Sequence, residues 1–177
     1  MPAEYELDHV DFITVNTVGP AGQRVFHLQA GQDSTLLTLI IEKEQAAALA
    51  ESVQSLLSEI GGRYSRETMQ PDLNLLDLDL HEPILPAFRV SQMGLGYDAD
   101  SDMLVLICNE LLPEDTPEEP RVARIGATRE QMSALAAHTE QVVAGGRPIC
   151  GNCGRPMDPE GHFCPQSNGH RKPVEWS

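Results

Sequence analysis

Four residues near the C-terminal end of this chain suit a single metal ion, and they restrict how that end can fold. Cys150 and Cys153 lie in a Cys-Gly-Asn-Cys turn, and Cys164 and His170 complete the spacing C-x2-C-x10-C-x5-H. A Cys-x-x-Cys turn can bring two thiolates to one ion, and structural zinc takes four sulfur or nitrogen ligands in a tetrahedron. We therefore expect the tail to fold as a knuckle around zinc rather than around an apolar core.

Two alternatives to this ligand set remain at the level of sequence. His162 lies two residues before Cys164 and is an alternate fourth ligand to His170. Cys150 and Cys153 would instead form a redox pair if they opened a helix after a strand, but they follow a Gly-Gly-Arg-Pro stretch. Because three sulfurs and one imidazole leave no position for water, the pattern favours structural zinc over catalytic zinc.

Charge divides the chain into two parts. Residues 1–144 carry 8 Lys and Arg against 24 Asp and Glu, a net charge of −16, and residues 145–177 carry 4 against 3, a net charge of +1. We therefore expect an acidic body, 1–144, that repels nucleic acid and anionic membranes, and a tail, 145–177, whose cations can contact a partner. Those cations are Arg147, Arg155, Arg171 and Lys172.

The first half of the body predicts three strands followed by a helix. Alternating or β-branched segments bounded by turn residues favour strands at Val10–Val18, Val25–Gln29 and Leu36–Ile41. Apolar residues at helical spacing then predict a helix from Lys43 to Ile60, which we expect Gly61-Gly62 to end.

The second half predicts the same order. Strands are expected at Phe88–Met93, Met103–Cys108 and Val122–Ile125, and Thr128-Arg-Glu-Gln131 has the form of a capping box that opens a helix running to Val143. The two helices also align at an offset of 86 residues. We therefore predict an α+β fold of two related β-β-β-α units, 8–62 and 87–144, that form an antiparallel sheet with both helices covering a face, followed by a zinc-ribbon-like knuckle.

Two stretches fit neither unit. Residues 65–86 alternate partly between apolar and polar residues, and we expect them to pack against the body because exposed rows of Leu promote aggregation. Residues 113–120 are acidic and bounded by Pro, which predicts an exposed loop.

Other candidate sites have plainer explanations. Asp98-Ala-Asp-Ser-Asp102 resembles the opening of a calcium loop but lacks the Gly and Glu that an EF-hand needs, so a hairpin turn is expected. Gly94 and Gly96 are expected at bulge or close-packing positions. Cys108 lies in an apolar segment and is expected in the core, and the sequence indicates no catalytic residues.

Two segments carry a resemblance to a known family. Phe88–Asp98 and the tail from Gly146 to His170, with Cys150, Cys153, Cys164 and His170 in place, resemble an uncharacterised bacterial family of unknown function. The resemblance covers nearly the whole chain. It implies a metal-binding tail, and it implies a pathway shared with a histidine-phosphatase-like and a lipid-kinase-like protein, without an activity.

Three functions remain after these observations. The first is a cytoplasmic adaptor or regulatory protein that binds zinc and acts through an unidentified protein partner, since we find neither a spanning segment nor an export signal. The second is an enzyme with a cleft between body and knuckle that acts on a phosphorylated or basic substrate. The third is local contact of the knuckle with nucleic acid. The sequence leaves the oligomeric state open.

Overall fold

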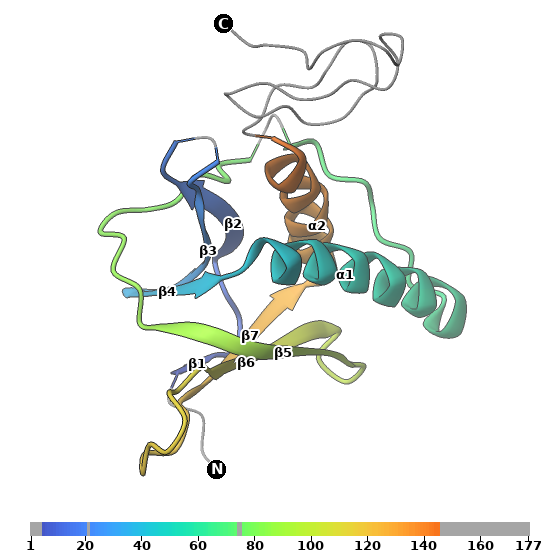
Figure 1. The fold of residues 1–177 in the computed structure, drawn as a ribbon. Helices are drawn as coiled ribbons and strands as arrows, with labels where there is room; N and C mark the ends of the chain where they lie inside the picture. Colours follow the sequence, from blue (N-terminus) through green and yellow to red (C-terminus); the bar gives the residue numbers. More distant parts are fainter. Residues whose placement is uncertain (1–4, 21, 74–75, 146–177) are drawn as a thin grey trace, which may run out of the picture.

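A computed structural model of the protein describes residues 5–20, 22–73 and 76–145. Within these residues, one seven-stranded sheet and two helices form the α+β fold that the sequence predicts (Figure 1). Three strands followed by a helix occur twice after a short first strand, although a common origin of the two units stays a prediction. The elements are β1 (Tyr5–Leu7), β2 (Phe12–Val18), β3 (Val25–Gln32), β4 (Thr35–Ile41), α1 (Lys43–Tyr64), β5 (Phe88–Asp98), β6 (Met103–Glu110), β7 (Val122–Thr128) and α2 (Arg129–Ala144).

The sheet is mixed, so the expectation of an antiparallel sheet is wrong at two places. Its strand order is β1-β7-β6-β5-β4-β3-β2. Neighbours within each half are antiparallel, but β4 pairs with β5 in parallel, and β1 pairs with β7 in parallel. The β4–β5 pairing is parallel because α1 carries the chain away from the end of β4, and the following segment brings it back to start β5 beside Leu39 and Ile40.

Helix α1 is longer than the sequence predicts. It passes through Gly61 and Gly62 and ends at Tyr64, with Ser65 in the left-handed conformation after it. Gly in a helix costs roughly 1 kcal/mol relative to Ala, so contacts made by the last turn must offset this cost. Tyr64 supplies one such contact, because its ring packs edge-on against Tyr97 at a centroid distance of 5.2 Å.

Helix α2 begins where its capping box predicts. The Thr128 hydroxyl accepts a hydrogen bond from the Gln131 amide at 3.1 Å, and the Gln131 side chain accepts one from the Thr128 amide at 2.8 Å. Both helices lie together on one side of the coiled sheet, where α2 packs against α1 and β2 (Figure 1). The core between them is apolar and includes Val15, Leu28, Leu39, Leu106, Ile125, Met132 and Leu135.

Residues 65–73 and 76–87, which we call the covering segment, lie between α1 and β5 in the chain. The segment leaves α1, passes α2, and then crosses the side of β2, β3 and β4 that faces away from the helices (Figure 1). Strand β3 is consequently buried along both faces, whereas strands of a sheet with one open face alternate between buried and exposed residues.

A buried polar row on the sheet holds the covering segment in place. Thr14, Gln29 and Thr38 are direct cross-strand neighbours, so their side chains point to the same face. Thr14 Oγ1 donates a hydrogen bond to the carbonyl of Leu78 at 2.6 Å. The Gln29 side chain both donates to the carbonyl of His81 and accepts from its amide, at 2.9 and 2.7 Å. The prediction that this segment packs on its own body is confirmed.

In the hairpin between β5 and β6, the predicted turn is confirmed, but the prediction for the two glycines is not. Residues 99–102 form the turn expected from the Asp-rich motif. The one register shift in this pair lies between Val90 and Gln92, and a Cβ at Gly94 or Gly96 would meet no atom within 4 Å. The expectation that these glycines mark a bulge or close packing is therefore wrong.

Candidate functional site

The predicted metal ligands and partner-binding cations lie outside the described residues. This applies to Cys150, Cys153, Cys164, His170 and the alternate ligand His162. It also applies to Arg147, Arg155, Arg171 and Lys172. Within residues 5–20, 22–73 and 76–145, no group of three or more His, Cys, Asp or Glu side chains is placed to hold a metal ion.

The point where the tail leaves the body is well defined. The amide of Gly145 donates hydrogen bonds to the carbonyls of Gln141 and Val142, at 2.8 and 3.3 Å, and so closes the last turn of α2. Arg24, at the end of the β2–β3 connection, donates to the carbonyl of Val142 at 2.9 Å. A cation at a helix C-terminus also interacts favourably with the helix dipole. The last turn of α2, up to Gly145, is therefore held both by its own hydrogen bonds and by Arg24.

A groove lies between the covering segment, the start of β2 and the first turns of α2. It has a volume of about 340 Å³. Its floor is apolar and consists of Phe12, Ile13, Pro71, Leu76, Leu78 and Ala134. Exposed carboxylates border this floor, among them Asp11 from the turn before β2, Asp77 from the covering segment and Glu130 from α2. We call this feature the acidic-rimmed groove.

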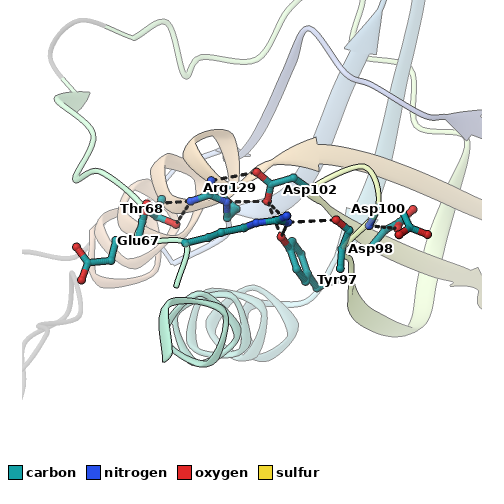
Figure 2. A network of polar contacts seen from close by, with 9 residues as sticks. Glu67, Thr68, Tyr97, Asp98, Asp100, Asp102 and Arg129 are labelled. Carbon is teal, nitrogen blue, oxygen red and sulfur yellow. Dashed lines mark hydrogen bonds and ion pairs between the residues drawn. The ribbon is translucent and has the colours of Figure 1, made fainter. Parts of the chain in front are cut away.

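A polar cluster ties the start of the covering segment to the β5–β6 turn and to α2 (Figure 2). Arg129, at the first position of α2, forms two hydrogen bonds with the carboxylate of Asp102, at 2.8 and 3.0 Å. The Tyr97 hydroxyl donates to the same carboxylate at 2.6 Å and accepts a hydrogen bond from Arg66. Arg129 also donates to the carbonyl of Glu67 at 2.9 Å. Three segments that are far apart in the sequence therefore meet at Asp102.

The electrostatics of this cluster fix its charge. The hydrogen bonds from Arg129, then that from Tyr97, lower the pKa of Asp102 to about 2. The carboxylate is thus ionised at neutral pH, and two guanidinium groups surround it. Because cations already occupy this site, it is a structural ion pair and not a calcium loop, as the sequence predicts.

Two other titratable side chains lie outside these sites, Cys108 in the core and His138 at a partly buried position on α2. Cys108 is fully buried, and burial raises the pKa of its thiol to about 12, which makes it a core residue and not a nucleophile. His138, on α2, has its pKa lowered by burial, and its Nε2 atom is buried without a hydrogen-bond partner. Neither residue lies in the Asp102 cluster.

Sequence reasoning missed both the Asp102 cluster and the acidic-rimmed groove. Contacts at and beside these sites join distant segments, such as Asp102 with Arg129, 27 positions apart, and Gln131 with the carbonyl of Val10, 121 positions apart. The motif Asp98–Asp102 predicted the turn, but nothing in one sequence indicated which arginines contact its last aspartate. Among the described helices, none combines the length and the apolar character needed to cross a membrane.

Comparison with known proteins places the chain in a family. The model of a family described as "Protein of unknown function (DUF3090)" matches residues 5–164, which is most of the 177-residue chain. The chain belongs to this family. The matched range of DUF3090 includes Cys150, Cys153 and Cys164, whereas His170 lies beyond it. No curated protein and no solved structure matches the chain.

Proposed function

We propose that the protein is a zinc-binding adaptor or regulatory protein of the cytoplasm, and that its tail contacts a protein partner. The observation that carries the proposal is the spacing of Cys150, Cys153, Cys164 and His170. Thiolate and imidazole donors suit zinc better than they suit calcium or magnesium, which prefer oxygen. The donor set therefore fits the metal, and four protein ligands make its role structural.

The charge of the tail supports a role in binding. Arg147, Arg155, Arg171 and Lys172 lie among or beside the four ligands. Folding around zinc would fix these cations on a small surface, and zinc binding contributes roughly 10–16 kcal/mol in small zinc peptides, enough to order a segment that lacks a core. A fixed cationic surface suits an acidic patch on a partner protein.

The first test is the metal content and the ligand set of the full-length protein. We expect one zinc per chain, with three sulfur ligands and one nitrogen ligand in X-ray absorption spectra. Cys153→Ala should lose the zinc, whereas Cys108→Ala, which removes a core thiol, should keep it. Absence of zinc from the freshly purified protein, or a bound oxygen in place of the fourth protein ligand, would contradict a closed structural site.

A second pair of variants identifies the fourth ligand. If His170 binds the metal, His170→Ala should replace the nitrogen in the absorption spectrum by oxygen and weaken zinc retention, while His162→Ala should change neither. The opposite result would assign the position to His162.

Binding of a protein partner by the tail cations is tested on zinc-loaded protein. Changing Arg147, Arg155, Arg171 and Lys172 to Gln should keep the zinc but abolish the interaction with any partner found by cross-linking in cells. Arg63→Gln is the matched control, because Arg63 is an exposed cation of the body, on α1. If the control and the fourfold variant bind the partner equally, the tail cations do not form the binding surface.

A further inference from the structure

The acidic-rimmed groove is an open surface with a defined chemical character. Leu76 on its floor is 46% exposed, and Phe12 beside it is only partly buried. Asp11, Asp77 and Glu130 on its border are all exposed. None of the described residues that line the groove is Lys, Arg or His. An occupant should therefore combine an apolar side chain with positive charge, because burial of exposed apolar surface and charge complementarity would both favour it.

Most cations of the body already form ion pairs with carboxylates that do not belong to the groove. The body contains 8 Lys and Arg, and most of them lie within 4 Å of a carboxylate. These paired cations are Arg63, Arg66, Arg89, Arg121, Arg124 and Arg129. Among the described residues, no ion pair joins a Lys or Arg to Asp11, Asp77 or Glu130, although His81 lies 3.7 Å from Asp77, so added positive charge would be favourable at the groove.

The end of this chain has the required composition. Residues 171–177 read Arg-Lys-Pro-Val-Glu-Trp-Ser, with two adjacent cations followed by Val174 and Trp176. Trp is the side chain that buries the most apolar surface, and a groove of about 340 Å³ is at the lower end of the range that takes a small ligand.

The tail is long enough to reach the groove. From Gly145 back to Glu130, helix α2 spans 15 residues, or roughly 22 Å at 1.5 Å per residue. Even if a metal held Cys150 and His170 together, five residues before Cys150 and six after His170 would remain, which can span roughly 36 Å at 3.3 Å per residue. The tail can therefore fold back along α2.

From this we propose that residues 171–177 dock in the acidic-rimmed groove of the same chain. Trp176 packs on Phe12, Leu76 and Leu78, and Arg171 and Lys172 lie against the carboxylates of the border. The groove is then an internal docking site that holds the tail on the body, and a partner that binds Arg171 or Lys172 must displace it. This inference does not depend on zinc, so the metal content and the docking can be tested separately.

A second copy of the chain is a poorer occupant. Each copy carries a net charge of −15, so two copies repel each other over the distances at which charges act in dilute buffer. Of the body and the tail, only the tail carries a net positive charge, and it is tethered to the body, which raises its effective concentration at the groove.

The single tryptophan of the chain is a natural probe of this docking. In dilute, full-length protein we expect Trp176 emission to be shifted to shorter wavelength than that of free N-acetyltryptophanamide, with acrylamide quenching reduced several-fold. The double variant Asp77→Lys, Glu130→Lys should abolish both effects, since it replaces attraction by repulsion. The matched control, Glu118→Lys with Glu119→Lys, makes the same change of charge on the exposed 113–120 loop and should leave Trp176 unchanged. Circular dichroism on all variants separates loss of docking from loss of folding.

Cross-linking gives a second readout that does not rely on charge reversal. The chain has two lysines, Lys43 and Lys172. A carbodiimide, which joins an amine to a carboxylate as an amide with loss of water, should link Lys172 to Asp11, Asp72, Asp77 or Glu130 within one chain, and Lys172→Arg should remove these links. Emission of Trp176 like that of free tryptophan would overturn the proposal. So would links of Lys172 only to other carboxylates, or protection that grows with protein concentration, which would indicate a second copy.

Discussion

Asp102 lies in a surface turn, yet its side chain connects this turn to α2 and to the covering segment. Its carboxylate receives hydrogen bonds from Arg129 and Tyr97, and Arg66 lies 3.5 Å away. Asp102 itself has a φ of 54°, in the left-handed region that Asn and Asp tolerate better than most residues. One residue thus shapes the turn and anchors α2 and the covering segment.

Replacing Asp102 by Asn should therefore destabilise the protein in a pH-dependent way. Asn keeps the left-handed backbone and removes the charge. We expect the free energy of unfolding at pH 7 to fall by about 1 kcal/mol, a low figure because Asp102 is more than a third exposed and solvent screens the pair. The pKa of Asp102 is lowered to about 2 in the folded protein, so its contribution is present above the ordinary pKa near 3.8 and is lost as the pH falls towards 2.

Urea unfolding of the wild type and Asp102→Asn between pH 7 and pH 2.5 measures this difference. It should stay constant down to about pH 4 and shrink below it, where the ordinary pKa of Asp lies. The control is Asp100→Asn in the same turn, which should have little effect at any pH because Asp100 makes no ion pair with these arginines. A difference independent of pH would mean that the carboxylate charge is not what stabilises the cluster.

Among single residues, local motifs were predictable and their distant partners were not. Thr128 and Gln131 form the predicted capping box because both lie within one helical turn. The Asp-rich turn was also predictable because its residues are adjacent in the sequence. Arg66 and Arg129 were not linked to it, because nothing short of the tertiary fold brings residues 36 and 27 positions away to one carboxylate.

The covering segment is the element that makes the two halves of the protein different. It crosses β2, β3 and β4 and leaves the corresponding face of β5, β6 and β7 more exposed, with Ile107 39% exposed. Two of its hydrogen bonds are made with the Gln29 side chain, which is fully buried and also donates to Thr38 at 3.0 Å. A buried amide in the middle of a sheet is tolerated only when its hydrogen bonds are satisfied.

Gln29→Leu should loosen the covering segment. The change keeps a similar size but leaves the amide and the carbonyl of His81 without their partner, and an unsatisfied buried polar group costs about 1–3 kcal/mol. We expect the free energy of unfolding to fall by about 2 kcal/mol and hydrogen exchange at the His81 amide to accelerate more than exchange in α2.

The matched control for this change is Gln92→Leu, at an exposed position on β5. It should change stability by less than about 0.5 kcal/mol. Equal effects of the two variants, or unchanged exchange at His81, would show that Gln29 does not hold the covering segment.

Element types followed from the sequence better than element ends did. The three strands and one helix of each half came from apolar periodicity, which is a local property. The end of α1 was wrong because Gly61 and Gly62 favour termination, whereas the packing of Tyr64 on Tyr97 extends the helix. Strand β1 was missed because three residues are too few for a periodic signal, and its pairing with β7 spans more than 100 positions.

The molecule as a whole combines an acidic body with a tail of opposite charge. The body carries −16 and the tail +1. The body has its own apolar core, built from both halves of the sheet and the two helices. The tail, in contrast, has the ligand spacing of a metal-stabilised module, so the two parts should respond differently to loss of metal.

Cys153→Ala should therefore unfold the tail and leave the body nearly intact. Removing one of four zinc ligands eliminates most of the free energy that we expect to fold the tail. We predict that the main thermal transition, followed by circular dichroism, shifts by no more than a few degrees, while proteolysis after Gly145 becomes rapid. A strong chelator added to the wild type should have the same effect.

The opposite outcome is equally informative. If Cys153→Ala lowered the body transition as much as it exposed the tail, the division at residue 144 would be wrong. The core would then depend on residues of the tail. The conservative control Cys108→Ala, in the core of the body, should lower the main transition without increasing cleavage of the tail.

By itself, the sequence determined the features that depend on residues close together in the chain. These are the order of the three strands and one helix within each half, the Thr128 cap, the Asp98–Asp102 turn and the membership of Cys108 in the core. The parallel β4–β5 pairing, the path of the covering segment over Gln29 and the arginines around Asp102 were decided only by the tertiary structure. The reason is physical: short-range hydrogen bonds and periodicity are encoded within a few residues, whereas which surfaces meet depends on how the whole chain buries its apolar faces.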